Sequence, residues 1–432
     1  MILSRVQVRT GVLVLWYNIK YISIIRSKIM SSHYIEMNEW KTVRRRLLFT
    51  CLLLIIYVIG TRIPLLSTPN ELNIDSTYKM TIANMGGNLD SINIFSLGLG
   101  PWLTAMIITM LYYYKFPEKM VKLTQYERSI REKILTLIIA IIQSCFLVRQ
   151  AYILNPEQPY SQWIAMLVLI SGSMLLMWMA DINTIRGIAG AMPIVFISII
   201  RSFLSQSSVL FSVGPIIVMF AFIFVLIAFI VLLVLELSEY HIKYEDIMTV
   251  STPYQKPYIA WKLNPSGSLS IMITIALFIS LKYFVDLMLH ALTLGDYVDT
   301  SFISFTNPLG ITLFVSMLFV FNFWLSVFML NPKNKAEMFQ KSGNYFIGIQ
   351  PGKATERFLK DKARKVSFVG AFIVTLIIGI PLFTTLLYPK SSVEIILSIQ
   401  IIMVVYIALN MVESVKTLLY FDRYEGFLKR YW

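Results

Sequence analysis

The chain has 432 residues, of which 57% are hydrophobic and 14% are charged, and its formal net charge is +14. An ordinary soluble domain carries roughly 25% charged residues. The composition excludes a soluble enzyme of this length, and also a disordered or nucleic-acid-binding chain, because too few polar side chains remain to cover the surface. The excess of lysine and arginine is therefore interpreted relative to a membrane, where these residues collect on one side.

Apolar runs dominate the chain. An α-helix rises about 1.5 Å per residue, so about 20 apolar residues cross a hydrocarbon core of about 30 Å. Ten runs have this length, and none shows the alternating pattern of an outer-membrane barrel. They cover approximately residues 47–66, 94–112, 134–153, 161–180, 188–204, 214–236, 266–289, 308–328, 366–387 and 393–415. The sequence therefore predicts an all-α polytopic membrane protein with ten transmembrane helices.

Basic residues determine the predicted orientation. With the N-terminus placed inside, 27 lysine and arginine residues from residue 37 onward fall in the inward-facing segments. Only Arg62, Lys79 and Lys390 fall in the outward loops. Because basic residues that flank spans are retained in the cytoplasm, we expect both termini on the cytoplasmic side of the plasma membrane.

Residues 1–36 form a predicted N-terminal extension. Their apolar core, 13–17, is too short to span a membrane and is not followed by a small-residue cleavage site, which disfavours a signal peptide. Two interpretations remain open. The segment is an interfacial helix, or the start codon is placed too far upstream and the chain begins at Met30 or Met37 rather than at Met1.

Two loops differ from simple connections. The outward loop 67–93 contains a semi-apolar segment, 81–87, which suits a cavity between helices, where irregular backbone is tolerated. The inward loop 329–365 is the most basic part of the chain, and its glycine and proline residues predict tight turns and an ordered structure. Its Pro351-Gly352-Lys353 lacks the spacing of a phosphate-binding loop.

In two of the spans we expect the helix to be interrupted. In span 2, Gly98, Gly100 and Pro101 interrupt the apolar run. Span 5 begins with small residues followed by Pro193, which removes one backbone hydrogen bond. Small residues also permit close approach of neighbouring helices.

No catalytic or metal-binding arrangement stands out. Cys51 and Cys145 lie in apolar runs, and the three histidines are far apart. Lys282 and Asp286 are four residues apart near the outer end of span 7, where an interfacial ion pair is favoured over a proton relay. We therefore expect no enzyme activity, no cofactor and no metal.

Short runs of residues with characteristic spacing carry a resemblance to a known family. The runs are Gly60-Thr61-Arg62-Ile63-Pro64, Ile94-Phe95-Ser96-Leu97-Gly98-Leu99-Gly100-Pro101-Trp102, Lys262-Leu263-Asn264-Pro265-Ser266-Gly267, Asn331-Pro332 through Lys341-Ser342-Gly343, Ile349-Gln350-Pro351-Gly352-Lys353-Ala354-Thr355, and Arg423-Tyr424-Glu425-Gly426. Over residues 37–432 the chain resembles the SecY family, the pore subunit of the bacterial protein-conducting channel.

The resemblance implies two pseudo-symmetric five-helix halves around an hourglass pore. A lateral gate lies between spans 2 and 7, flanked by spans 3 and 8. In the implied N-terminal half, residues 37–204 contain spans 1–5 and a plug at about 77–91. Residues 205–265 contain span 6 and a cytosolic loop. Residues 266–415 contain spans 7–10 and the basic loop 329–365, and residues 416–432 form a cytosolic tail.

The resemblance also implies a ring of apolar side chains that seals the waist of the pore. Pairs four residues apart in spans 2 and 5 face one way, and a flexible apolar constriction excludes ions by dewetting. The implied ring is Leu99, Leu103, Met192, Phe196, Met272 and Met403, and the central plug residues are Ile82, Met85, Gly86 and Gly87.

The chain departs from the usual family pattern at several positions. The ring holds three methionines and one phenylalanine, where the family is usually rich in isoleucine. Gln350 stands where an arginine usually precedes Pro-Gly, and Tyr240-His241-Ile242-Lys243 stands where the family has Arg-Arg-Ile-Pro. These departures indicate a divergent paralogue that binds a different motor, similar to the accessory SecY of Gram-positive bacteria.

That resemblance implies several partners. They are a SecA-type motor ATPase, small SecE/SecG-like or accessory Sec membrane subunits, a preprotein with a signal sequence, and the lipid bilayer. The accessory type exports serine-rich glycosylated surface adhesins. The expected motor-docking residues are Gln350, Lys353, Arg357 and Lys360.

Other functions remain as alternatives. A housekeeping SecY channel is the alternative within the family. A secondary transporter or flippase would need a charged central cavity, whereas this sequence offers a methionine-rich waist. A membrane insertase or scaffold would never open a full aqueous pore.

Overall fold

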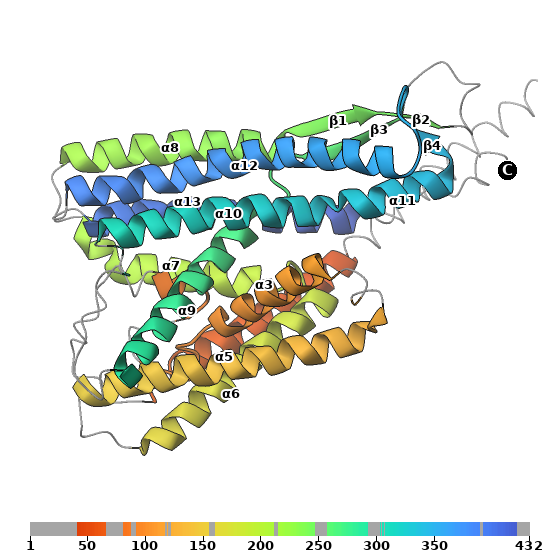
Figure 1. The fold of residues 1–432 in the computed structure, drawn as a ribbon. Helices are drawn as coiled ribbons and strands as arrows, with labels where there is room; N and C mark the ends of the chain where they lie inside the picture. The colour runs from red at the N-terminus through yellow and green to blue at the C-terminus, as the bar shows by residue number, and fades with distance from the viewer. Residues whose placement is uncertain are drawn as a thin grey trace, which may run out of the picture.

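The computed structural model describes residues 41–65, 81–87, 92–116, 119, 122–154, 160–210, 215–246, 257–292, 303, 305, 307–388 and 392–420. The predicted extension 1–36, both ends of the predicted plug and the tail beyond residue 420 lie outside the described residues. A helix is present in each of the ten predicted apolar runs. These helices are residues 41–60, α3 (Gly100–Lys115), α5 (Gln125–Leu154), α6 (Gln162–Arg186), α7 (Met192–Leu210), α8 (Pro215–Leu237), α9 (Gly267–Leu292), α10 (Pro308–Leu330), α12 (Lys353–Leu387) and α13 (Ser392–Tyr420) (Figure 1).

Six helices are long and apolar enough by themselves to cross a membrane: α5, α6, α9, α10, α12 and α13. The other four are shorter or more polar over their described residues. Helix 41–60 carries three arginines near its start, α3 has only 16 residues, and α7 and α8 contribute the shorter apolar stretches Met192–Gln206 and Phe222–Leu237. The chain is nevertheless an all-α polytopic membrane protein, as predicted.

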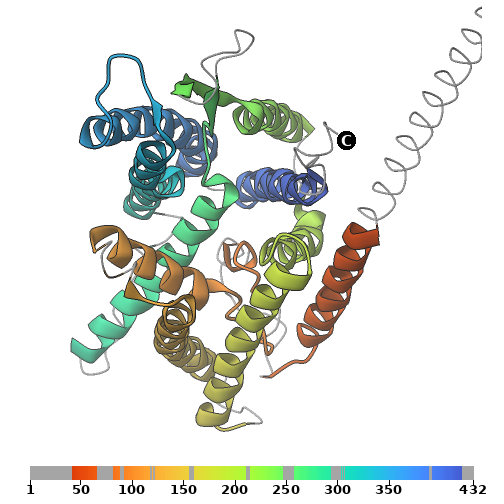
Figure 2. The same cartoon turned by 90° about the vertical axis from the view of Figure 1, so that its right-hand side faces the viewer.

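The helices form two groups with α9 between them. In Figure 1, α8, α10, α12 and α13 lie together on one side, and α3, α5 and α6 lie on the other. Helix α9 runs obliquely between the groups and contacts α3, α5, α10 and α13. Helix α7 contacts α13, and the view in Figure 2 shows the helices arranged around a central segment that belongs to residues 81–87. A continuous apolar core connects both groups.

Two helices begin later than the apolar pattern predicted. Helix α3 starts at Gly100 rather than near residue 94, because Gly98 has a left-handed φ of 61° and Pro101 suits the first turn of a helix. Helix α7 starts at Met192 rather than at residue 188. The turn before it is held by Asn183, whose amide nitrogen donates to the carbonyls of Ile188 at 2.9 Å and Gly190 at 2.7 Å.

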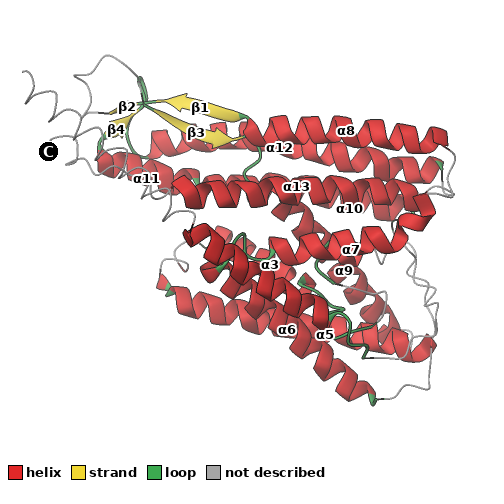
Figure 3. Ribbon diagram, turned by 180° about the vertical axis from the view of Figure 1, so that it is seen from behind, coloured by secondary structure: helices red, strands yellow, loops and turns green. Residues whose placement is uncertain are grey.

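A small platform of strands and short helices extends beyond one end of the helices (Figure 3). Strand β1 (Glu239–Lys243) pairs with β3 (Tyr258–Lys262), and β2 (Glu245–Asp246) pairs with β4 (Asn344–Tyr345), all antiparallel. Helix α11 (Pro332–Ser342) and the first turns of α12 complete the platform around a separate apolar cluster. The expected order in the loop 329–365 is therefore confirmed, whereas the four strands were not predicted.

Candidate pore and plug

The segment 81–87 is a short helical turn, residues 81–83, followed by a tight turn. Its side chains Ile82 and Met85 are both buried, each only 3% exposed. The segment lies among the helices and not on the surface of the molecule (Figure 2). We call residues 81–87 the plug segment.

Three hydrogen bonds seat the plug segment, and each donor comes from a different element. The Tyr57 hydroxyl, on helix 41–60, donates to the Gly86 carbonyl at 2.9 Å. The Ser198 hydroxyl, on α7, donates to the Gly87 carbonyl at 2.8 Å. The Leu99 amide, just before α3, donates to the carbonyl of Met85 at 2.8 Å. Three successive buried carbonyls are thus satisfied, as buried backbone requires.

The backbone of the plug segment touches the turn before α3. A Cβ atom added at Gly98 would lie 2.5 Å from the Gly87 nitrogen and 2.8 Å from the Met85 carbonyl oxygen. Gly98 and Gly86 also have φ values of 61° and 75°, which glycine adopts without strain. Glycine at position 98 is therefore required both for the turn and for the close approach of the two backbones.

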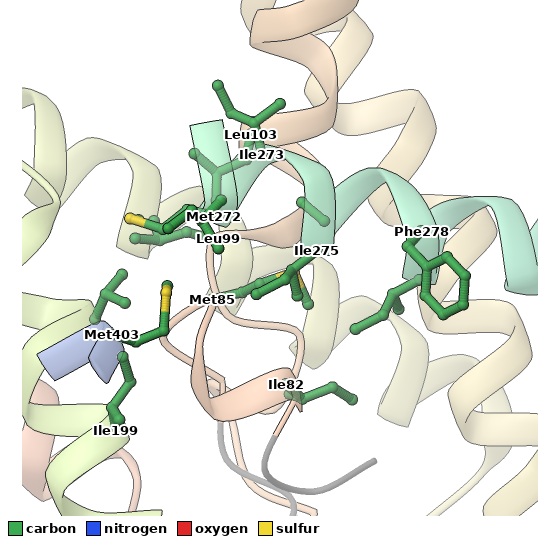
Figure 4. Packing of buried hydrophobic residues seen from close by; sticks show 14 of the residues in the cluster. Ile82, Met85, Leu99, Leu103, Ile199, Met272, Ile273, Ile275, Phe278 and Met403 are labelled. Carbon is green, nitrogen blue, oxygen red and sulfur yellow. The ribbon is translucent and has the colours of Figure 1, made fainter. Parts of the chain in front are cut away.

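The expected ring residues all belong to the apolar core or pack against it. Leu99, Leu103, Met272 and Met403 are fully buried, and Met192 and Phe196 are half-buried against the same core. Figure 4 shows side chains from the start of α3, from α9 and from α13 grouped beside Ile82 and Met85 of the plug segment. The structure thus places the six expected ring residues in one core together with the expected plug residues.

A cavity of about 30 Å³ lies between the plug segment and the helices α9, α10, α12 and α13. Thr81 and Asn84 of the plug segment line it. The remaining lining residues are apolar: Ile271, Ile275, Phe305, Phe314, Ile378, Leu382, Ile396, Ile399 and Met403. The Oδ1 atom of Asn84 is buried here without a hydrogen-bond partner. An unsatisfied buried acceptor raises the free energy of the seated segment.

The expected motor-docking residues lie on the platform. Gln350, Lys353 and Arg357 are exposed, and Lys360 is half-buried. The Gln350 carbonyl accepts a hydrogen bond from the Thr355 hydroxyl at 3.0 Å, which fixes the turn that leads into α12. The pairing of β2 with β4 joins this loop to the loop between α8 and α9.

The platform also carries an exposed apolar residue that the sequence did not identify as functional. Ile347 is 72% exposed at the tip of the loop between α11 and α12, beside Gly348. An apolar side chain between two glycine-rich turns, Ser342-Gly343 and Pro351-Gly352, is the sequence signal that would have found it.

An ionic cluster joins the platform to the helices and was also missed from the sequence. The Lys262 Nζ atom, on β3, lies 3.0 Å from the Glu236 Oε1 atom on α8 and also pairs with Glu413 on α13. Burial alone lowers the pKa of Lys262, but its hydrogen bonds to Glu413 and Glu236 outweigh that effect and raise the pKa above its usual value. The cation therefore stays charged and holds three elements together.

No group of three or more histidine, cysteine, aspartate or glutamate side chains in the part of the chain that the structure describes is placed to hold a metal ion. Cys51 and Cys145 are both free thiols.

Solved structures share this arrangement of helices around a central segment. A protein-conducting channel superposes with a TM-score of 0.63 at 16% identity, covering 90% of this chain and 95% of that one. A SecY protein described with its plug domain gives a TM-score of 0.62 at 17% identity, and Sec61 from a canine ribosome–channel complex gives 0.57 at 15%. The fold is that of the protein-conducting channels.

Comparisons with other sequences show the family as well as the fold. The SecY family model matches residues 93–412. The accessory Sec system protein translocase subunit SecY2 of Staphylococcus carnosus is 44% identical over 367 residues, covering 85% of this chain and 99% of that protein. The proteins of the same description from Staphylococcus haemolyticus and Staphylococcus aureus are 43% and 42% identical over 92% of this chain. The chain belongs to the SecY family, and the predicted likeness to its accessory type is confirmed.

Proposed function

We propose that the chain is the pore-forming subunit of a protein translocase of the accessory Sec system. In this role it conducts unfolded preproteins across the plasma membrane, with both termini in the cytoplasm. The observation that carries the proposal is the plug segment, seated by three hydrogen bonds inside the apolar core that also contains the expected ring residues. A segment held in this way closes a path that opens when the segment leaves.

The apolar ring supplies the second part of the seal. Leu99, Leu103, Met272 and Met403 offer no hydrogen-bonding groups to water, so a narrow passage lined by them excludes ions. Methionine side chains are unbranched and adapt to differently shaped neighbours. The ring thus closes around an extended polypeptide of varied sequence, with Met192 and Phe196 at its half-buried edge.

The platform is the proposed docking surface for a SecA-type motor. Lys353, Arg357 and Lys360 present cations on the same platform as the exposed Ile347, and an acidic partner surface with an apolar part complements them. ATP hydrolysis on the motor supplies the energy, and the channel itself catalyses no reaction. Small SecE/SecG-like or accessory membrane subunits complete the complex, and serine-rich glycosylated adhesins are the proposed substrates.

A photo-crosslinker at Phe196 tests whether a polypeptide passes the ring. Phe222 on α8 is 67% exposed and serves as a control that faces away from the core. A preprotein stalled during export is expected to crosslink to position 196 only when ATP and the motor are present, and not to position 222. If positions 196 and 103 both fail to crosslink while the preprotein is still exported, the path lies elsewhere and the transporter or scaffold alternative returns.

A further inference from the structure

Two pairs of aromatic rings bridge the contact between α3 and α5 on one side and α9 and α10 on the other. We call this contact the seam. Tyr114 of α3 lies against Trp324 of α10, with ring centroids 5.3 Å apart and an interplanar angle of 42°. Phe146 of α5 lies against Tyr283 of α9, with centroids 4.6 Å apart and an angle of 45°.

The two pairs lie toward opposite ends of the seam. Tyr114 is the next-to-last residue of α3, and Trp324 lies in the last two turns of α10, which leads directly into the platform. Phe146 and Tyr283 lie in the last third of α5 and α9, and α9 leads away from the platform. The rings therefore close the seam at both ends.

The pair near the platform is accessible from outside the molecule. Tyr114 is 45% exposed and Trp324 is 41% exposed, so the edges of both rings meet whatever surrounds the helices. Tyr283 of the other pair is only 4% exposed. An apolar segment that enters this end of the seam from the membrane thus contacts Tyr114 and Trp324 and has to separate them before it reaches the core there.

We propose that these two aromatic pairs determine how apolar a signal sequence has to be to part the seam. The proposal rests on the proposed channel function and adds the residues that set the threshold. A tilted ring pair attracts beyond the effect of burial, and each pair is expected to favour the closed seam by a factor of about 2 to 12. Because the pairs are far apart, their factors multiply.

The width of the seam is measurable without motor or substrate. Trp324→Leu and Phe146→Leu each remove one ring and leave an apolar side chain. Nitroxide labels at the exposed positions Ile108 on α3 and Val320 on α10 report the distance across the seam in the purified full-length chain, with the native cysteines replaced by serine. Each variant is expected to raise the population of the wider distance about 2- to 12-fold, and the double variant by the product.

A matched control is available in an aromatic pair that does not cross the seam. Phe319 of α10 and Phe368 of α12 have ring centroids 5.6 Å apart, and both helices lie on the same side of the seam. Phe319→Leu is expected to leave the distance across the seam unchanged. An unchanged distance in the double seam variant, or an equal widening in Phe319→Leu, overturns the proposal.

Export of a preprotein whose signal sequence has lost part of its apolar residues tests the threshold itself. Trp324→Leu is expected to raise export of this weakened preprotein several-fold above that of the parent channel, while the parent preprotein is exported equally by both. A wider seam without improved export of the weakened preprotein overturns the role in selection. If the parent channel exports neither preprotein, the proposed function fails, and the label distances still test the seam by themselves.

Discussion

Tyr57→Phe removes a single oxygen atom from the seat of the plug segment. The lost hydroxyl donates to the Gly86 carbonyl at 2.9 Å, while the ring stacks on Phe95 with centroids 5.8 Å apart and is retained. The carbonyl then stays buried without this donor, which costs about 1–3 kcal/mol for as long as the segment remains seated. At 1.4 kcal/mol per tenfold change, the equilibrium moves roughly 5- to 150-fold toward the unseated state.

Ser198→Ala has the same consequence at the next carbonyl. Its hydroxyl donates to Gly87 at 2.8 Å, and the carbonyl is left unsatisfied in the variant. Because the two hydroxyls hold adjacent residues, the double variant with Tyr57→Phe is not expected to show the sum of the two single effects.

Ion current through the purified channel in a planar bilayer, without motor or preprotein, measures the unseated fraction. The parent chain is expected to be nearly silent, and both variants are expected to conduct in intermittent openings. Tyr152→Phe is the control, because its hydroxyl contacts the Tyr160 carbonyl at an exposed position far from the plug segment. Currents in Tyr57→Phe and Ser198→Ala that equal those of Tyr152→Phe would refute the role of these hydrogen bonds.

Three further substitutions test other parts of the account. Gly98→Ala places a Cβ atom 2.5 Å from a backbone nitrogen of the plug segment, so we expect it to increase the bilayer current. Gly348→Ala is the control, because position 348 has a similarly positive φ but open space around it. Equal currents in the two variants argue against the close approach of the two backbones. Lys262→Gln leaves two carboxylates without their shared cation and is expected to lower the free energy of unfolding by about 1–3 kcal/mol, with an unchanged melting temperature as the contrary result. Arg357→Glu on the platform is expected to weaken motor binding about tenfold. Lys41 is an exposed cation outside the platform, and Lys41→Glu is expected to leave motor binding unchanged. The two variants are compared by how strongly each stimulates the ATPase activity of the motor.

The spans were predictable because each is a long apolar run, and length alone decides between helix and strand in a membrane. Their limits were less predictable, since they depend on single backbone angles. Residues 94–99 are apolar enough to continue span 2, but the left-handed φ of Gly98 ends the pattern and α3 begins at Gly100. The start of α7 likewise depends on the turn before it. That turn is held by Thr50, which is far away in the sequence, and by Asn183 near the end of α6.

The two strand pairs of the platform were missed for different reasons. Strand β4 has only two residues, Asn344–Tyr345, and its partner β2 lies about a hundred residues earlier. Strand β1 shows alternating burial with Ile242 inside, but five residues are too few to distinguish a strand from a loop. Pairing between distant segments leaves no periodic signal in either segment alone.

The ring residues were predicted through the resemblance, whereas the hydrogen bonds that seat the plug segment were not. Leu99 and Met403 occupy recognisable positions in apolar spans, so motif spacing placed them. Tyr57 and Ser198 are single hydroxyls within apolar helices, and only the fold shows that they face the carbonyls of Gly86 and Gly87. Hydrogen bonds to backbone carbonyls carry no sequence signature at the acceptor.

Transport into sealed vesicles tests the central claim most directly. Vesicles that contain the full-length chain as their SecY-type protein, together with its small membrane subunits, are supplied with the motor, ATP and an accessory-type preprotein. The preprotein is expected to become protected from added protease, and this protection is expected to be lost when ATP, the motor or the chain is left out. Equal protection in vesicles without the chain would contradict a polypeptide path through this protein.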